Sequence, residues 1–234
     1  MEFADYPRPS LAVDPAVLAV SDGEIYTILW QRAWKPFPGK WALPGVFVGQ
    51  EESLEEAAKR GIYTKVGIST TQVQQLFAWN KPSRDERGWV VTIAYFVIVP
   101  FVDLVASHQN RNSLFKIVPS GGYGAEDLEI KVIDANGSVI ELAFDHGKIL
   151  TSVLERLREV IWNRDTALQF LPENFTMRSL QGVYEVILGR SLNKDSFRKR
   201  VTHTQGLVMP TGTMEANVSH RPAELYQRSL DYGF

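Results

Sequence analysis

The segment from Leu43 to Ile68 combines residue types that suit the binding of a phosphorylated ligand. Leu43-Pro44-Gly45 is followed by Glu52 and by Ser53-Leu54-Glu55-Glu56, which is the capping box of a helix. Arg60 lies on that helix, and a guanidinium binds either phosphate oxygens or a carboxylate in pairs. Two roles for Arg60 therefore remain open: contact with a ligand phosphate, or an ion pair with Glu52 that holds the loop to the helix.

This segment resembles the Nudix box, the strand-loop-helix motif of hydrolases that act on nucleoside diphosphates linked to another group. The family pattern has Gly, five residues, Glu, seven residues, and then Arg-Glu-apolar-any-Glu-Glu-any-Gly-apolar. The positions that match are Glu52, Arg60, Ile62, Gly67 and Ile68. The positions that differ are Val46 in place of the first Gly, Gly61 in place of the Glu after Arg, and Thr64 and Lys65 in place of the paired Glu.

The differences fall on one side of the predicted helix. Positions 61, 64 and 65 are three and four residues apart and share a helix face, where the resemblance implies carboxylates around magnesium. Magnesium requires oxygen ligands, whereas Gly61, Thr64 and Lys65 offer a hydrogen, a hydroxyl and an ammonium. Without the metal, no Lewis acid would activate water. We therefore expect no metal, no cofactor, no catalytic residue and no hydrolysis, with a working Nudix hydrolase as the alternative.

Composition limits the remaining classes of protein. The chain has 234 residues, 44% hydrophobic and 22% charged, with no cysteine, and so no disulfide or thiolate metal site. No apolar run approaches the roughly 20 residues of a membrane span, and the N-terminus lacks the features of a signal peptide. His146, His203 and His220 are too scattered for a metal cluster. These features predict a soluble protein of the cytoplasm that does not contact membranes.

The predicted elements divide the chain into two parts. Residues 11–100 alternate β-prone runs with turns around one helix, and hairpins are indicated at Ser21-Asp22-Gly23 and at Asp134-Ala135-Asn136-Gly137. After Phe144 the apolar period changes from two to 3.6, which is typical of helices. We expect strands at 11–20, 25–30, 89–99, 128–133 and 139–144, and helices capped by Asp145 and Thr176.

The C-terminal part also has the pattern of a helix-turn-helix. Gly189 ends one predicted helix, and a four-residue turn leads to another that runs from Lys194 to about His203 and buries Phe197 and Val201. Residues 189–234 contain seven Lys and Arg against four Asp and Glu, a balance of +3, so residues 1–188 carry −5. The basic residues of the last helix would face outward, as a DNA-binding surface requires.

Further segments across the chain, in the same order, resemble the Nudix-related transcriptional regulators called NrtR. They include Tyr6-Pro7-Arg8-Pro9-Ser10, Ser83-Arg84-Asp85-Glu86-Arg87, Leu142-Ala143-Phe144-Asp145-His146, Ser196-Phe197-Arg198-Lys199-Arg200 and His220-Arg221-Pro222-Ala223-Glu224. The resemblance implies an α+β protein: an N-terminal Nudix domain, an α/β/α sandwich with a mixed sheet, over residues 1–143, and a winged helix-turn-helix over residues 144–234. It also implies a homodimeric, nucleoid-associated bacterial repressor of NAD-metabolism genes that ADP-ribose or a related nucleotide releases from a palindromic double-stranded DNA operator.

Resemblance and charge together indicate which residues contact the effector and which contact DNA. We expect the effector to meet Arg32, Phe37, Glu52, Arg60, Arg84 and Arg87. Phe37, Trp41, Trp79 or Trp89 could stack on adenine, although a single aromatic residue more often belongs to the core. We expect DNA to meet Lys194, Ser196, Arg198, Lys199, Arg200 and Arg221, with a two-stranded wing between Leu207 and Ser219.

One segment departs from the family. Between Val105 and Leu142 the chain has Ile117-Val118-Pro119-Ser120-Gly121-Gly122-Tyr123-Gly124 and a predicted hairpin, where members of the family have a Trp-containing strand and a short loop. This difference could change the wall of the effector pocket. A regulator of the same architecture that responds to a sugar is therefore a further alternative. A scaffold that uses its C-terminal part for protein contacts explains the basic helix and the wing less well.

Overall fold

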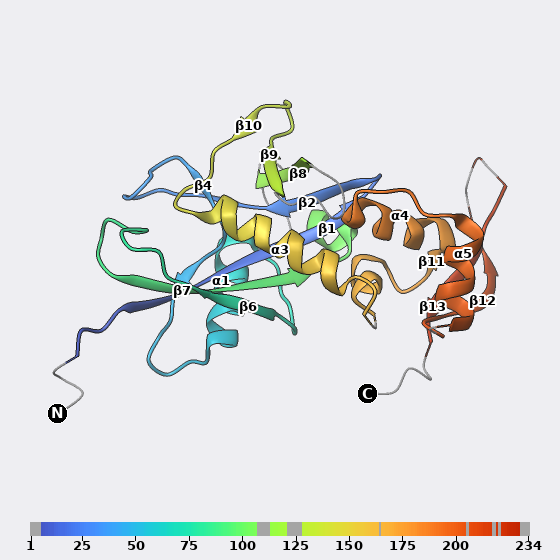
Figure 1. Cartoon of the computed structure of the whole chain (residues 1–234), viewed down its shortest axis with the longest axis horizontal. Coiled ribbons are helices and arrows are strands. Elements are labelled where there is room, and N and C mark those ends of the chain that lie inside the picture. Colours follow the sequence, from blue (N-terminus) through green and yellow to red (C-terminus); the bar gives the residue numbers. More distant parts are fainter. Residues whose placement is uncertain are drawn as a thin grey trace.

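The computed structural model describes residues 6–106, 113–120, 128–163, 165–204, 206–216, 219 and 221–229. Figure 1 shows a sheet-containing part that is continued by a smaller helical part. The helices are α1 (Leu54–Val66), α2 (Phe101–Ala106), α3 (His146–Val160), the 3-10 helix η3 (Thr166–Phe170), α4 (Met177–Leu188), α5 (Lys194–Lys199) and the π-helix η4 (Arg200–Thr204). The strands are β1 (Ser10–Ser21), β2 (Glu24–Ile28), β3 (Trp30–Gln31), β4 (Trp41–Ala42), β5 (Val46–Phe47), β6 (Gln74–Trp79), β7 (Val90–Ile98), β8 (Leu114–Ser120), β9 (Glu129–Ile133), β10 (Val139–Ile140), β11 (Phe175–Thr176), β12 (Val208–Met214) and β13 (Glu224–Arg228).

The large sheet is mixed, as predicted. Its order is β10-β9-β8-β2-β1-β7-β6, and β5 also pairs with β1. Strands β1 and β7 run parallel, whereas the other pairs are antiparallel. Both predicted hairpins are present, because Ser21 pairs with Glu24 and Ile133 pairs with Val139. The positive φ of Asp22 and Gly23 is what a two-residue hairpin turn requires.

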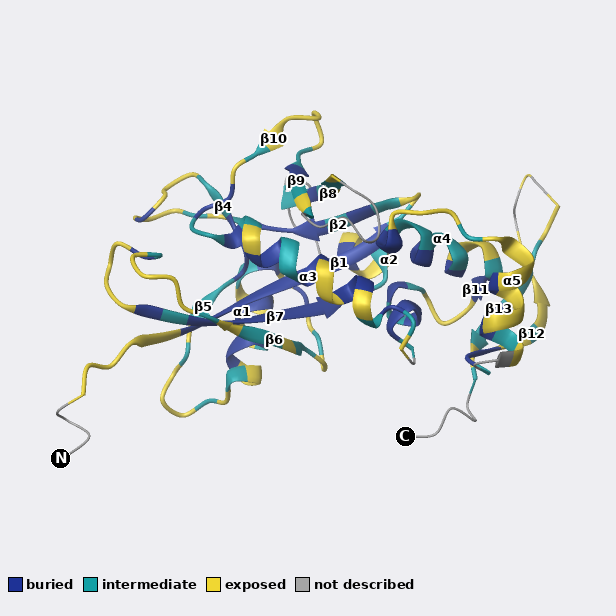
Figure 2. Cartoon of the chain, viewed as in Figure 1, coloured by how far each residue is buried: buried dark blue, intermediate teal, exposed yellow. Residues whose placement is uncertain are grey.

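Two helices cover the two faces of this sheet. Successive residues of a strand point to opposite faces, so Val17 and Ala19 of β1 pack with α1, whereas Ala16 and Leu18 pack in the cluster that contains α3. Figure 2 shows β1 and β7 buried between these layers. The predicted α/β/α sandwich is therefore confirmed.

The caps define the ends of α1 and α4. The capping box at Ser53 and Glu56 is complete, and Gly67 ends α1 in the left-handed conformation with φ 74°. Thr176 caps α4 by accepting the Ser179 amide, and Gly189 ends α4 with φ 64°. Asp145 precedes α3 but makes no side-chain cap hydrogen bond, so the predicted cap is wrong. Its carboxylate accepts hydrogen bonds from Trp79 and Arg84 instead.

Several predicted strands have different bounds. The run 25–30 is interrupted after Ile28, and the run 139–144 forms only the two residues of β10. The wing is also placed differently, because β12 pairs with β13 beyond Ser219 rather than with a strand inside 207–219. Of the divergent segment, residues 107–112 and 121–127 lie outside the described residues, while 114–120 and 129–133 form the paired strands β8 and β9.

The C-terminal part shares a continuous apolar core with the sheet. Phe197, Val201 and Tyr226 belong to the same cluster as Leu18 of β1 and Leu154 of α3. Helix α3 contacts β9, β1 and α4, and so it connects the two parts along its length. The positions of the two parts are therefore linked by direct packing around α3 (Figure 1).

Candidate effector pocket and DNA-binding surface

A pocket of about 430 Å³ lies beside α1 and β5, at one end of β1. Four of the predicted effector residues line it: Arg32, Arg60, Arg84 and Arg87. The other two lie at its border, since Glu52 pairs with Arg60 and the Phe37 ring meets the edge of the Phe144 ring at 5.0 Å. The remaining lining residues are Ala12, Asp14, Trp30, Trp34, Lys35, Leu43, Gly45, Val46, Phe47, Lys65, Asp85, Val90, Phe144 and His146.

Arg60 forms the ion pair with Glu52 that the sequence suggested. Its Nε and Nη2 lie 2.9 Å and 2.5 Å from the two carboxylate oxygens, and Nη2 also donates to the Phe47 carbonyl at 2.9 Å. The hydrogen bonds from Arg60 and from the Gly49 amide lower the pKa of Glu52 to about 2. Arg60 thus joins the loop to α1, while contact of Arg60 with a ligand phosphate stays a prediction.

Arg84 is the centre of a buried ionic network. Its Nη2 lies 2.6 Å from Asp145 and 3.2 Å from Asp14, and only 4% of its side chain is exposed. Trp79 donates its indole N–H to Asp145 at 2.6 Å. Burial alone would raise the pKa of Asp145, but the hydrogen bonds and charge of Arg84 outweigh burial and hold that pKa below its ordinary value. Arg84 therefore fixes the start of α3 to β1.

His146 belongs to the same buried region. Its Nδ1 accepts the Leu43 amide at 2.9 Å, and burial lowers the pKa of His146 below its ordinary value. A neutral imidazole that accepts a backbone N–H positions the loop before β5. His203 lies in η4, far along the chain, and His220 lies outside the described residues.

Three cations of the pocket lie over aromatic rings. Lys65 Nζ is 3.6 Å from the centre of the Trp30 ring. The Arg32 guanidinium carbon is 4.7 Å from the Phe144 ring and 5.7 Å from the Trp30 ring. Arg87 pairs with Asp85 at 2.6 Å and lies 5.1 Å from the Phe47 ring. Aromatic faces attract cations, so these rings hold positive charge at the pocket wall.

The aromatic residues of the pocket were predicted less well. Trp41, Trp79 and Trp89 do not line it: Trp41 packs edge-on against Phe115 in the core, and Trp79 bonds to Asp145. Sequence reasoning missed Trp30, Trp34, Phe47 and Phe144. Trp30 could have been predicted from the sequence, because it precedes Arg32 by two residues and residues two apart in a strand face the same side.

The residues at positions 61, 64 and 65 offer no carboxylate to a divalent metal. A Cβ on Gly61 would lie 2.5 Å from the Pro44 carbonyl oxygen, so no carboxylate fits there without a backbone shift. Thr64 donates its hydroxyl to the Arg60 carbonyl at 2.7 Å, and Lys65 brings positive charge. Over the described ranges, no group of three or more His, Asp or Glu could hold a metal ion.

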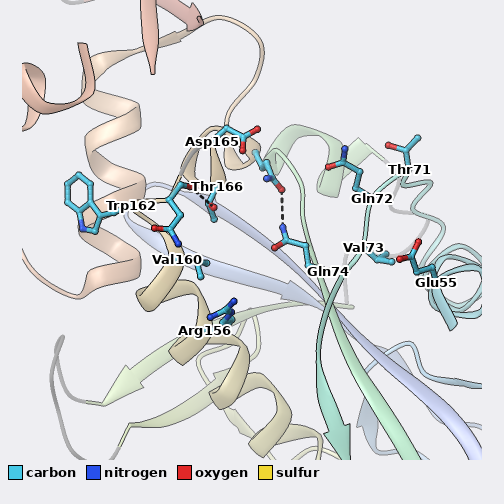
Figure 3. Close-up of a pocket in the computed structure, with 12 residues that line it drawn as sticks. Glu55, Thr71, Gln72, Val73, Gln74, Arg156, Val160, Trp162, Asp165 and Thr166 are labelled. Atoms are coloured by element: carbon cyan, nitrogen blue, oxygen red, sulfur yellow. Dashed lines mark hydrogen bonds between the residues drawn. The ribbon is translucent and has the colours of Figure 1, made fainter. Parts of the chain in front are cut away.

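A second hollow, of about 810 Å³, lies between the edge strand β6 and the segment that follows α3 (Figure 3). Gln74 donates to Gln169 across it at 3.5 Å. Its charged lining residues are of both signs: Arg156, Glu55 and Asp165. This balanced lining lacks the excess of cations found in the first pocket.

The predicted DNA-binding residues lie on and around α5. Lys194, Ser196 and Lys199 are exposed on the helix, while Phe197 is buried beneath it. Asn193 accepts the Ser196 amide at 3.0 Å and so fixes the first turn. Arg198 donates to the Tyr226 hydroxyl at 2.7 Å, and this bond links the helix to β13.

The remaining two predicted contacts flank α5. Arg200 has its guanidinium carbon 3.6 Å from the centre of the Trp162 ring. Arg221 is exposed in the segment before β13. With α4 and the turn, these residues form a basic helix beside a three-stranded sheet of order β11-β13-β12, whose β12-β13 pair is the wing of a winged helix-turn-helix.

No helix in the described ranges combines the length and the apolar character needed to cross a membrane. Two family models match the chain: a NUDIX domain over residues 12–113 and the NrtR DNA-binding winged helix domain over residues 167–227. Fold and pocket thus define a two-domain protein, a Nudix domain joined to a winged helix.

Individual relatives support the same assignment over nearly the whole chain. The ADPR responsive transcriptional repressor NtrR of Acinetobacter baylyi is 32% identical over 234 residues, which are 99% of this chain and 87% of that protein. The chain therefore belongs to the NrtR family of Nudix-related transcriptional regulators. The ADP-ribose pyrophosphatase of Methanocaldococcus jannaschii is 32% identical over 145 residues, which are 62% of this chain and 73% of that protein.

Solved structures match both parts together. The Shewanella oneidensis NrtR complexed with a 27mer DNA has 30% identity and a TM-score of 0.74, with coverage of 95% of this chain and 94% of that chain. A MutT/nudix family protein from Enterococcus faecalis has 26% identity and a TM-score of 0.73, with coverage of 98% and 90%.

Proposed function

We propose that this chain is a DNA-binding repressor whose Nudix domain binds ADP-ribose or a related nucleoside diphosphate and does not hydrolyse it. The observation that carries this proposal is the match of both domains at once to a DNA-bound NrtR, with a TM-score of 0.74 over 95% of the chain. The curated relative named as an ADPR responsive repressor supports the same effector.

The charge of the pocket supports a diphosphate ligand. Six Lys and Arg line it: Arg32, Lys35, Arg60, Lys65, Arg84 and Arg87. Four carboxylates pair with them, those of Asp14, Glu52, Asp85 and Asp145, which leaves a formal charge of +2. The diphosphate of ADP-ribose carries two negative charges, whereas a neutral sugar would not need this excess. The rings of Trp30 and Phe144 give a base apolar faces to stack on.

The absence of hydrolysis is proposed from three residues. Gly61, Thr64 and Lys65 replace the acids that would hold magnesium, and the contact of Gly61 with Pro44 leaves no room for a side chain. The similarity to an ADP-ribose pyrophosphatase makes hydrolysis the alternative to test. An effector that persists after binding can report its own concentration, whereas cleavage would remove the signal.

We assign DNA contact to Lys194, Ser196, Arg198, Lys199, Arg200 and Arg221, with the winged helix over residues 144–234 and the effector domain over residues 1–143. Two copies would present two recognition helices to a palindromic operator, about 34 Å apart. A homodimer is therefore part of the proposal. A repressor acts where the chromosome lies, so we expect the protein on the bacterial nucleoid in the cytoplasm.

The decisive experiment is a gel shift on the DNA upstream of the protein's own gene, with ADP-ribose, NAD or arabinose added, beside a magnesium-dependent assay for AMP and ribose 5-phosphate formed from ADP-ribose. We expect a shifted band that ADP-ribose releases and no turnover. A band unaffected by ADP-ribose but released by arabinose would establish the sugar alternative. Turnover of ADP-ribose that Glu52→Gln abolishes would establish the hydrolase.

The DNA-contact assignment has its own control. Lys199→Ala should weaken operator binding and reduce the slope of log K against log salt by about 1, because one phosphate contact is lost. Lys148→Ala removes an exposed lysine from α3, near the effector pocket, and should change neither quantity. Equal effects of the two substitutions would contradict the assignment.

A further inference from the structure

The cations of the effector pocket differ in whether a carboxylate neutralises them. Arg60, Arg84 and Arg87 each form ion pairs. Arg32, Lys35 and Lys65 form none within the part of the chain that the structure describes. Two of these three uncompensated charges, those of Arg32 and Lys65, lie beside the Trp30 ring.

Lys65 is held at this position from two directions. Its backbone lies in the last turn of α1, which the capping box and Gly67 fix at the two ends. Its ammonium rests on the Trp30 ring, whose indole N–H donates to the Leu43 carbonyl at 2.8 Å and so cannot rotate freely. The positive charge of Lys65 is therefore preorganised at the pocket wall.

The positive charges of Arg32 and Lys65 repel each other, although Arg32 also donates to the Pro36 carbonyl at 2.6 Å. Burial and the nearby charge of Arg32 both lower the pKa of Lys65. Burial and the charge of Arg87 likewise lower the pKa of Arg32, although Asp85 and Asp14 oppose this effect. An anion placed between Arg32 and Lys65 would relieve this repulsion, which favours phosphate oxygens at that point.

We propose that the Lys65 ammonium, together with the Arg32 guanidinium, binds the diphosphate of the effector directly and so replaces the divalent metal of a Nudix enzyme. This inference rests on the proposed function, because it assumes a diphosphate ligand in this pocket. In a Nudix hydrolase a bound divalent metal supplies positive charge to the diphosphate. In this chain the side chains of Lys65 and Arg32 supply that charge. Effector binding is consequently independent of magnesium and dependent on Lys65.

Isothermal titration calorimetry of the full chain with ADP-ribose tests both consequences. The wild-type protein should bind with equal affinity in EDTA and in magnesium. Lys65→Met should weaken binding roughly ten- to a hundredfold, as expected for loss of a hydrogen bond to a charged group. Lys59→Met is the matched control, since Lys59 lies on α1 but does not line the pocket. The affinity of this variant for ADP-ribose should equal that of the wild type.

The outcomes separate the inference from the proposed function. A tenfold gain in wild-type affinity on adding magnesium would overturn metal independence, and this measurement needs no variant. Lys65→Met affinity equal to that of the wild type, in protein that still shifts operator DNA, would overturn the role of Lys65. If the wild-type protein bound no ADP-ribose in either buffer, the proposed effector would be wrong and the inference would fall with it.

Discussion

The guanidinium of Arg200 lies 3.6 Å from the centre of the Trp162 indole ring. Trp162 follows α3, and its ring also packs 4.4 Å from the ring of Tyr184 in α4. Arg200, to which we assign DNA contact, is thus held by the segment that follows α3. The orientation of Arg200 depends on where the end of α3 lies.

We predict that Trp162→Leu weakens operator binding by a few fold to about thirtyfold, because a cation–π contact contributes roughly 0.5–2 kcal/mol. Trp162→Phe keeps an aromatic face and should lose less. Fluorescence anisotropy with labelled operator measures both. In an Arg200→Gln background, Trp162→Leu should add little further loss, and an undiminished effect there would show that Trp162 acts through another contact.

Gly61→Ala should destabilise the protein. The added Cβ would meet the Pro44 carbonyl oxygen at 2.5 Å, and overpacking of this kind costs about 1–3 kcal/mol. Gly182→Ala is the matched control, because Gly182 lies in α4 with nothing within 4 Å of an added Cβ. That change should stabilise by up to about 1 kcal/mol. Urea unfolding of both variants checks the difference, and equal stabilities would contradict the close approach of α1 to Pro44.

Arg84→Met should lower the free energy of unfolding more than removal of any exposed arginine does. It would leave Asp14 and Asp145 buried without their partner, which costs about 3–5 kcal/mol. Arg156→Met breaks the exposed pair with Glu159 and should cost less than about 1 kcal/mol. If chemical denaturation gave similar free energies of unfolding for the two variants, the network around Arg84 would not stabilise the fold as described.

The acid titration of Glu52 reports on the loop that carries the Nudix-like turn. Its carboxyl pKa of about 2 lies below the ordinary 4.5, so the ion pair stabilises the folded state fully above pH 4.5. This contribution decreases as the pH falls from 4.5 towards 2. Carbon-detected NMR should find a midpoint near 2 in the wild type and a higher one in Arg60→Met. An unchanged midpoint in the variant would exclude Arg60 as the main cause.

Local patterns predicted most of the fold. The capping box at Ser53, the terminating Gly67 and Gly189, and the turn at Asp22-Gly23 act over four or five residues, and all are present. The parallel pairing of β1 with β7 joins residues about eighty positions apart, and sequence spacing contains no information on such a partner.

The candidate site was predicted in part for the same reason. Charge and family resemblance indicated four of the basic residues that line the pocket, Arg32, Arg60, Arg84 and Arg87, but not Lys35 or Lys65. The cap assigned to Asp145 was wrong because a distant guanidinium, that of Arg84, offers its carboxylate stronger bonds than the local backbone does. The second wing strand was missed because it begins at Glu224, well beyond the end of β12 at Met214 and beyond the predicted limit of Ser219.

Helix α3 extends from the effector pocket to the C-terminal part of the chain. Its fifteen residues span about 22 Å, from the pocket wall at His146 towards the ring under Arg200. A hydrogen-bonded rod of this length bends little, so a tilt imposed at one end displaces the other. The proposed effector pocket and the arginine nearest the proposed DNA surface therefore lie at opposite ends of one helix.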